Sequence, residues 1–205
     1  MKKLLALPVA LPITMIAAPA FAHHPMGGEA PQTFAHGLLS GLAHPVIGVD
    51  HLAFVLLAGI AATVRGVGLA APLAFIAATM AGTLLILAGV TLPGAELAIA
   101  LSVVLLGALL VSGRDMARPV ALAGFAAAGL FHGWAYGEAV IGSEPMPVAA
   151  YLLGFAAIQF AIAAAAAKAT EAGMRAGYQP RIAAALLTGV GVAFMAEHVE
   201  HLILG

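Results

Sequence analysis

The sequence has no cysteine and very little charge. Of its 205 residues, 8% are charged and 63% are hydrophobic. A soluble domain averages about 25% charged residues, so this chain cannot cover a water-facing surface. The absence of cysteine excludes disulfides, thiolate zinc sites and iron–sulfur clusters, and the sequence has no basic stripe of the kind that binds nucleic acid. The composition therefore predicts an all-α, polytopic helical bundle in a membrane, in which any metal ion is held without cysteine.

The N-terminus carries the three parts of a secretory signal peptide. Met1-Lys2-Lys3 is a basic start, residues 4–18 form a short apolar run, and Ala20-Phe21-Ala22 matches the small-x-small cleavage pattern. The alternative is an uncleaved anchor helix, but the run is shorter than the roughly 20 residues that a span requires and contains two prolines. We predict a cleavable signal peptide at 1–22, a histidine-containing periplasmic leader at 23–32 and a transmembrane bundle at 33–205.

The predicted leader begins with two imidazoles. Cleavage after Ala22 would place His23 and His24 beside a free α-amine outside the cytoplasm. These groups together can collect a metal ion weakly. The alternative is a flexible polar terminus without a binding role, because chain ends are often poorly ordered.

Six apolar stretches follow, each close to the length that a bilayer requires. Proline, glycine and charged residues mark the joints between them. We predict transmembrane helices at 48–64, 69–90, 95–112, 119–140, 147–167 and 182–204. On the fourth span, glycines four residues apart would let a neighbouring backbone approach closely. These packing positions are Gly129, Gly133 and Gly137.

The positive residues predict an orientation. After the signal peptide, every Lys and Arg falls in alternate loops, and cytoplasmic loops carry the excess of these residues. With the mature N-terminus outside, as the signal peptide also requires, all of these loops are cytoplasmic. Both mature termini then face the periplasm, and the protein lies in a bacterial inner membrane. The residues concerned are Arg65, Arg114, Arg118, Lys168, Arg175 and Arg181.

The segment 33–43 is too short for a seventh span, and an extra crossing would invert every loop. It is either a half-helix or re-entrant segment, or the outer part of one long, kinked first helix. Pro45 lacks an amide donor and restricts the residue before it, so we expect a break at His44-Pro45. Non-helical backbone at that depth must be buried in protein or line a wet cavity.

Two imidazoles and a carboxylate lie where the first predicted span begins, in His44-Pro45-Val46-Ile47-Gly48-Val49-Asp50-His51. An ionisable group beside hydrocarbon is costly, and this donor set suits a divalent transition metal. The alternative is a helix-start device, in which Asp50 caps the first turn and the histidines lie in the headgroup layer. We predict that His44, Asp50 and His51 bind a metal ion at the outer end of this span.

A second polar group lies in the fourth span, in Phe131-His132-Gly133-Trp134-Ala135-Tyr136-Gly137-Glu138. His132 and Tyr136 are four residues apart and share a helix face, whereas Glu138 points elsewhere in a regular helix. His132 and Glu138 could reach one ion only if the glycines permitted local unwinding. The alternative is a structural His132 that is hydrogen-bonded to a neighbouring helix.

A third polar group lies in the outer part of the sixth span, in Glu197-His198-Val199-Glu200-His201. His201 is three residues from His198 and four from Glu197, so either pair is adjacent on a helix. The order differs from the H-E-x-x-H motif of zinc proteases, and a polar helix end that reaches water is the alternative. With His36, every histidine beyond the leader lies in the outer half of the membrane or just outside it. This layer has no Lys or Arg and so favours cation capture.

Two of these motifs resemble the HupE/UreJ family of bacterial membrane proteins. They are His-Pro-x-x-Gly-x-Asp-His-Leu, from His44, and Phe-His-Gly-x-Ala-x-Gly-x-Glu, from Phe131. The resemblance implies a nickel or cobalt permease associated with nickel–iron hydrogenase or urease. It implies metal-binding roles for His44, Asp50, His51, His132 and Glu138. Tyr136 stands where the family usually has a second histidine. The further metal-binding candidates come from the topology alone: His23, His24, His36, Glu197, His198 and His201.

The motifs and the resemblance together predict a secondary transporter, with Ni²⁺ or Co²⁺ as its substrate and no permanent cofactor. The sequence has no P-loop, so energy must come from a gradient or a partner. The alternatives are an intramembrane metalloenzyme, for which no nucleophile motif is found, and a metal-binding accessory protein that does not transport. The predicted partners are the metal ion, the lipid bilayer, and either a second copy of the chain or a periplasmic or outer-membrane protein that supplies metal.

Overall fold

The computed structural model describes residues 30–204, and every regular element within them is a helix. The predicted signal peptide and most of the predicted leader, including His23 and His24, lie outside the described residues. The predicted all-α bundle is confirmed. In chain order the elements are α1 (Phe34–Ile47), α2 (Val49–Val64), α3 (Ala70–Leu87), α4 (Ala95–Ser112), α5 (Arg118–Gly137), the 3₁₀ helix η2 (Glu138–Val140), α6 (Pro145–Arg175) and α7 (Pro180–Leu204).

Each predicted span is helical, and the ends agree within a few residues except in α6, which continues past 167 to Arg175. By length and composition, α3, α4, α6 and α7 can each cross a membrane, and α1 with α2 can do so as a bent pair. α5 has 20 residues but contains polar His132, which lowers its hydropathy. α5 is not among these candidate spans, but it packs along α3 in the same helical bundle.

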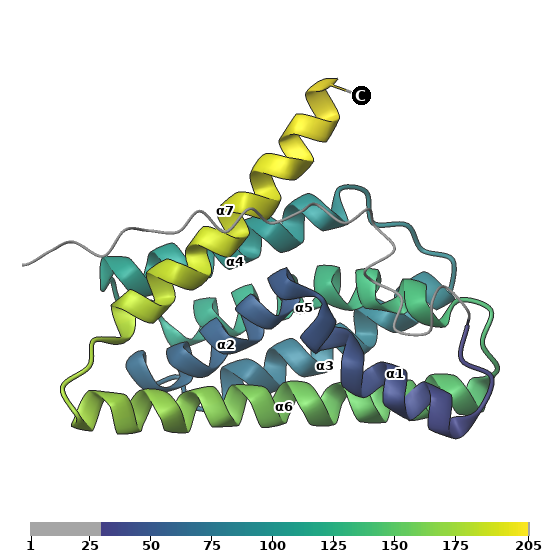
Figure 1. Ribbon diagram of the computed structural model, residues 1–205, viewed down its shortest axis with the longest axis horizontal. Helices are drawn as coiled ribbons and strands as arrows, with labels where there is room; N and C mark the ends of the chain where they lie inside the picture. The colour runs from purple at the N-terminus through teal and green to yellow at the C-terminus, as the bar shows by residue number, and fades with distance from the viewer. Residues whose placement is uncertain (1–29, 205) are drawn as a thin grey trace, which may run out of the picture.

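α1 and α2 form a bent pair of helices that runs along α6. They have 14 and 16 residues, and at about 1.5 Å per residue neither spans the roughly 30 Å hydrocarbon core alone. A Cβ on Gly37 of α1 would lie 2.2 Å from the Pro147 carbonyl oxygen, and one on Gly59 of α2 would lie 2.4 Å from that of Ala163. Both helices therefore run in the direction of α6, one after the other. In Figure 1 they form the two arms of an inverted V, whose apex points away from α6.

The break lies at Gly48 rather than at His44-Pro45, where the sequence predicts it. Gly48 has an extended conformation (φ −73°, ψ 101°), and the two helices are bent by 80°. Pro45 lies inside α1, which continues to Ile47, so its missing amide donor does not by itself end the helix. A Cβ on Gly48 would lie 2.6 Å from Cδ2 of His51, so glycine leaves room for that imidazole at the break.

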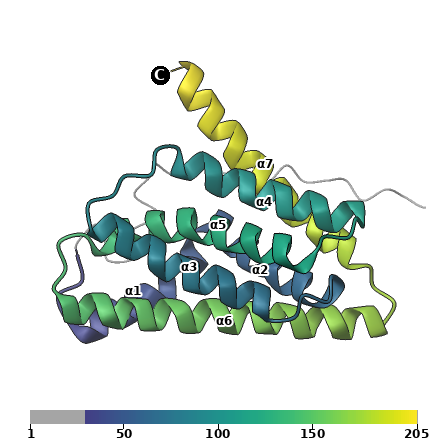
Figure 2. The same cartoon turned by 180° about the vertical axis from the view of Figure 1, so that it is seen from behind.

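α3 and α5 lie side by side and parallel (Figure 2), and glycines of α5 line their contact. A Cβ on Gly129 would lie 2.4 Å from the Phe75 carbonyl oxygen, and one on Gly133 would lie 2.0 Å from that of Thr79. Gly137 faces the next turn of α3 in the same register. The four-residue glycine spacing therefore brings two helix backbones into direct contact, as small residues do in membranes.

α7 packs against α4 in the opposite direction. Gly107 of α4 lies against Thr188, and Gly191 of α7 lies against Val103. His198 of α7 still lies 3.8 Å from Glu96 of α4, and the C-terminal end of α7 then projects from the bundle, as Figure 1 shows. Its last residues, Leu202, Ile203 and Leu204, are 75–76% exposed.

One end of the bundle collects the positive residues and is here named the basic end. Arg65, after α2, donates to the Leu109 carbonyl oxygen at 2.7 Å and lies 3.7 Å from the Asp115 carboxylate. Arg181, at the start of α7, lies against Gly113 at the end of α4. The ends of α2 and α4 and the start of α7 therefore meet. α2 and α4 thus run toward the basic end and α7 runs away from it, as expected for helices that are joined by short loops and alternate in direction.

A glycine-to-alanine substitution can test the close backbone contact between α3 and α5. Gly133→Ala should destabilise the protein by about 1–3 kcal/mol, because its Cβ would overlap the Thr79 carbonyl oxygen. Gly124→Ala on the same helix is the matched control, since a Cβ there meets nothing within 4 Å. Thermal unfolding in detergent measures both variants. Equal stability of the two would contradict the direct contact at Gly133.

Candidate metal-binding site at the helix break

The break places three polar side chains inside the bundle. His44, Asp50 and His51 are only 2%, 1% and 2% exposed. They come from the last turn of α1 and the first turn of α2. All three lie where α2, the first predicted span, begins, and the packing of the surrounding helices buries them.

His51 and His132 are joined by a hydrogen bond of 2.8 Å between their Nδ1 atoms. Ser102 on α4 determines where the protons lie. Its hydroxyl donates to the Ile99 carbonyl oxygen at 2.7 Å, so it accepts from Nε2 of His132, 2.9 Å away. Neutral His132 then accepts at Nδ1 from the Nδ1–H of His51. This chain puts the lone pair of His51 on Nε2, a nitrogen through which imidazoles bind metals.

His44 is oriented in the same way by Tyr151 of α6. The Tyr151 hydroxyl donates to the Tyr136 carbonyl oxygen at 2.9 Å, so it accepts from Nδ1 of His44 at 2.8 Å. Neutral His44 therefore also has its lone pair on Nε2. Metal-binding histidines are commonly oriented by a hydrogen bond at the other ring nitrogen, and both imidazoles of the break have one.

Tyr136 lies among these imidazoles. Its ring stacks on His51 with centroids 4.1 Å apart, and the ring of His44 meets it edge-on at 4.9 Å. Its phenol oxygen is buried and has no hydrogen-bond partner within the described chain. The position where the family resemblance implies a replaced histidine thus lies inside the cluster and offers an oxygen there.

Asp50 has one carboxylate oxygen engaged and one without a partner. Oδ1 accepts from the His51 amide at 2.8 Å, as an acidic residue in a first helical turn commonly does. Oδ2 is buried and has no hydrogen-bond partner among residues 30–204. A buried carboxylate oxygen costs free energy unless a cation or a proton neutralises it. A role at the helix start explains the hydrogen bond of Oδ1 but does not explain why Oδ2 is buried without a partner.

The cluster is not arranged as a finished coordination shell. The described residues contain no group of three or more His, Asp and Glu side chains that could hold a metal ion. His51 and His132 direct their Nδ1 atoms at each other, and the rings of His44 and His51 are 6.4 Å apart. A metal ion bound through Nδ1 of His132 would require its hydrogen bond with His51 to break.

The other predicted ligands lie away from this cluster. Glu138, the first residue of η2, is exposed, whereas His132 is fully buried. His36 is exposed near the start of α1. His198 lies 3.8 Å from the Glu96 carboxylate, across the contact between α7 and α4. Glu197 and His201 are exposed on the projecting part of α7.

Sequence patterns do not point to Tyr151 or Ser102. Tyr151 lies four residues before Phe155 in a long apolar helix, a spacing that is equally typical of aromatic packing. Ser102 is a single hydroxyl in an apolar helix and carries no motif. Only the packing of α4 against α5, and of α6 against the break, shows that both hydroxyls orient imidazoles.

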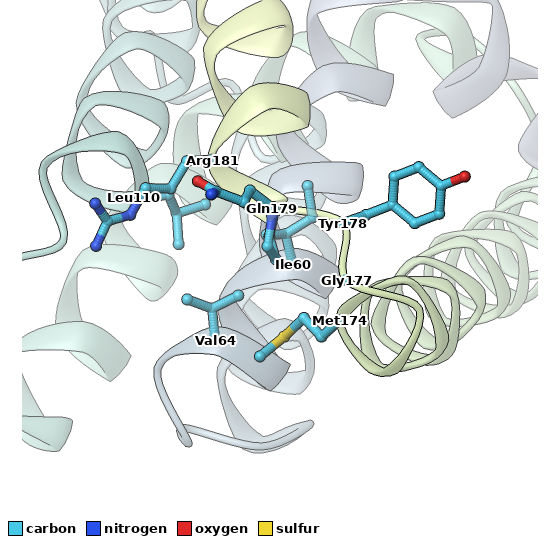
Figure 3. A pocket seen from close by; sticks show the side chains of 9 residues that line it. Ile60, Val64, Leu110, Met174, Gly177, Tyr178, Gln179 and Arg181 are labelled. Atoms are coloured by element: carbon cyan, nitrogen blue, oxygen red, sulfur yellow. The ribbon is translucent and has the colours of Figure 1, made fainter.

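An apolar core separates the cluster from the basic end. Phe54 and Phe75 pack on His132 with ring centroids 4.8 and 5.2 Å away, and both belong to this core. Beyond the core, a pocket of about 510 Å³ opens at the basic end (Figure 3). Its lining includes core residues Ile60 and Leu110, together with Val64, Met174 and Arg181.

Comparison with known proteins agrees with the sequence resemblance. The family model for the HupE / UreJ protein matches residues 11–194. The chain belongs to the HupE/UreJ family. Protein HupE of Rhizobium leguminosarum bv. viciae is 35% identical to this family member over 128 residues, which are 61% of this chain and 64% of the relative. The match therefore spans less than two thirds of the relative's length. No solved structure matches this HupE/UreJ chain.

The hydrogen-bond chain of this HupE/UreJ protein predicts tautomers. In metal-free protein, ¹⁵N NMR should show His132 protonated at Nε2 and His51 at Nδ1. Ser102→Ala removes the acceptor for His132, so the His132 signals should change. Ser112→Ala on the same helix is the control, because Ser112 is exposed and donates only to the Leu109 carbonyl oxygen. Unchanged His132 signals in Ser102→Ala would contradict the deduced tautomers.

Proposed function

We propose that this protein is a secondary transporter that carries Ni²⁺ or Co²⁺ across the bacterial inner membrane. Its family membership and its membrane-crossing helices support a membrane role in metal handling. The choice of ion rests on the family resemblance and on ligand chemistry. Imidazole nitrogen with carboxylate oxygen suits both ions, and geometry and supply must select between them.

The observation that carries the proposal is the buried Asp50 carboxylate with Oδ2 unpartnered. Asp50 is next to His51, whose tautomer places a lone pair on Nε2. His44 has the same tautomer and lies on the other side of the break. A divalent cation here would neutralise the carboxylate and use two pre-oriented imidazoles. This donor set supports binding of a transition-metal ion at the break.

We assign the first contacts with the ion to His44, Asp50 and His51. His132 would join when its bond to His51 breaks, and Tyr136 would offer its phenol oxygen. Glu138 is exposed at the end of α5 and would act before the ion reaches the buried cluster. Similar roles at the outer surface are proposed for His23, His24, His36, Glu197, His198 and His201.

Release of the ion requires a conformational change. The apolar core around Phe54 and Phe75 lies between the cluster and the basic end. Secondary transporters commonly bind their substrates at broken helices deep in the membrane and then rock or gate one part of the bundle against another. The α1–α2 break fits this scheme, and the pocket at the basic end would receive the ion.

We place the basic end in the cytoplasm and both mature termini in the periplasm. Arg65 and Arg181 lie at this end, and cytoplasmic ends of membrane helices carry the excess of Arg and Lys. Ions released there would reach the compartment in which hydrogenase or urease is assembled. Supply of one of these enzymes is the physiological role that the family resemblance implies.

A metal-binding accessory protein, with or without catalysis but without transport, is the alternative function. The apolar core between the cluster and the basic end favours it, because a protein that only holds a metal needs no inward route. The two functions make opposite predictions for metal uptake.

Asp50→Asn tests the proposed role of the carboxylate. The asparagine oxygen can still accept from the His51 amide, so the helix start is kept while the charge is lost. Nickel uptake by cells that express the variant should fall by about tenfold or more, since a contact to a charged group contributes roughly 1.5–3 kcal/mol. Uptake of radioactive nickel relative to cells without the protein is the measurement.

Asp115→Asn is the matched control, because Asp115 is a fully exposed carboxylate at the basic end. It should take up nickel at the wild-type rate. Wild-type uptake by Asp50→Asn would reject the role of this carboxylate. Nickel binding without any uptake by the wild type would replace the transporter with the accessory function.

The proposed orientation predicts which loops a reagent can reach. The native chain has no cysteine, so each introduced cysteine is a unique label. Thr91→Cys, in the exposed joint between α3 and α4, should react with a membrane-impermeant maleimide on spheroplasts. Asp115→Cys, at the basic end, should react only after the membrane is permeabilised. The reverse pattern would place the basic end outside.

A further inference from the structure

Gln159 of α6 is a fully buried amide that the proposed cluster does not use. Gln159 and Thr79 of α3 are both 0% exposed. Nε2 of Gln159 donates to Oγ1 of Thr79 at 3.4 Å, and the carbonyl oxygen Oε1 has no hydrogen-bond partner in the part of the chain that is described. A buried oxygen without a partner is costly in a membrane interior.

The amide cannot be turned round to satisfy this oxygen. The Thr79 hydroxyl donates its only proton to the Ile76 carbonyl oxygen at 2.7 Å. The hydroxyl oxygen can therefore only accept a hydrogen bond from Gln159. The NH₂ group of the amide, and not its oxygen, must then face Thr79. Oε1 is held facing away from Thr79. Ser102 and Tyr151 orient His132 and His44 by the same means, a hydroxyl whose proton is already given to a backbone carbonyl.

Gln159 lies on α6 between a glycine contact of α1 and one of α2. A Cβ on Gly41 of α1 would lie 2.9 Å from the Phe155 amide nitrogen. A Cβ on Gly59 of α2 would lie 2.4 Å from the Ala163 carbonyl oxygen. Gln159 follows Phe155 by four residues and precedes Ala163 by four, so it lies on α6 between the positions that α1 and α2 contact.

The same face of α6 connects Gln159 with the cluster. Tyr151, Phe155 and Gln159 are spaced by four residues and are all fully buried. Tyr151 is hydrogen-bonded to His44, and Phe155 lies edge-on to Tyr136 with centroids 4.4 Å apart. Gln159 follows one turn closer to the basic end. It is thus the next polar group on this face after the cluster.

We propose that Oε1 of Gln159, held by Thr79, is a transient oxygen site for the ion as it leaves the cluster toward the basic end. This inference rests on the proposed transport function. A neutral amide oxygen holds a divalent ion less strongly than imidazole with carboxylate does, and conduction needs a site that the ion can leave. The oxygen contacts the ion directly or through a water molecule that the ion carries.

A purely structural hydrogen bond between α3 and α6 is the competing explanation. It uses the NH₂ group of Gln159 and gives no role to Oε1. The two explanations differ in what they predict for Gln159→Glu. An ionised carboxylate keeps oxygen donors but cannot donate to Thr79, whose own proton is engaged. A transit role therefore predicts faster transport by Gln159→Glu than by Gln159→Leu, and a structural role does not.

The test uses the full chain, purified and reconstituted in liposomes that enclose a nickel-sensitive dye. The initial uptake rate is measured against external NiCl₂, and equilibrium binding of Ni²⁺ is measured by calorimetry in detergent. Gln159→Leu should lower the maximal rate by about tenfold or more, since it removes one contact to a charged ion. Its equilibrium affinity should stay within about twofold of the wild type, because the cluster ligands are unchanged.

Thr79→Val provides a second variant that keeps the side-chain shape, and it should also lower the maximal rate with little change in affinity. Thr188→Val is its matched control. The Thr188 hydroxyl likewise donates to a carbonyl oxygen of its own helix, that of Ala184, but it lies in the contact between α7 and α4. This control should transport at the wild-type rate.

The outcomes separate this inference from the transporter proposal. Wild-type rates in both Gln159→Leu and Thr79→Val would overturn the transit site and leave transport standing. Equally slow Gln159→Glu and Gln159→Leu, with both variants less stable than wild type, would favour the structural hydrogen bond and also overturn it. Absence of uptake by the reconstituted wild type would instead overturn the proposed function.

Discussion

The contact of two short helices with one unbroken helix is the constraint on which the rest of this structure depends. A bilayer core has no water to satisfy backbone groups, so a break in a crossing must be covered by protein. α6 provides this cover, because Gly37 and Gly59 let both arms of the break lie on its backbone. At the break itself, the amide of Gly48 bonds the His44 carbonyl oxygen at 3.1 Å. The same arrangement buries His44, Asp50 and His51 at the break.

Hydroxyl groups orient buried polar side chains of the bundle without adding charge. Ser102, Tyr151 and Thr79 each give their proton to a backbone carbonyl and then accept from an imidazole or an amide. Each therefore selects one proton position in its partner. Among the described residues the only fully buried acidic side chain is that of Asp50. The interior thus combines one buried carboxyl group with imidazole and amide groups whose hydrogen-bond partners fix their orientation.

The sequence predicts the helices of this protein better than it predicts the site. Long apolar runs between prolines, glycines and charges set the helix ends, because chain length across a bilayer is a strong physical constraint. The burial of His44 and Asp50 among the helices could not be predicted, since it depends on how α1 and α2 pack against α6. Sequence motifs did mark His51 and His132, which the fold brings into contact from 81 positions apart. The orienting hydroxyls come from helices that carry no motif, so only their packing shows them.

The pairing of the helices has a consequence for symmetry. With α1 and α2 counted as one unit, the bundle has six helical units among the described residues. The first unit runs parallel to the fifth, the second runs parallel to the fourth, and the third runs antiparallel to the sixth. Exchanging each of the first three units with the one three places later turns the first pairing into the second and keeps the third. Consecutive units alternate in direction, so this exchange also inverts the bundle. The pairing scheme is therefore that of two inverted halves, which is the symmetry by which one fold can present the same contacts to either side of a membrane.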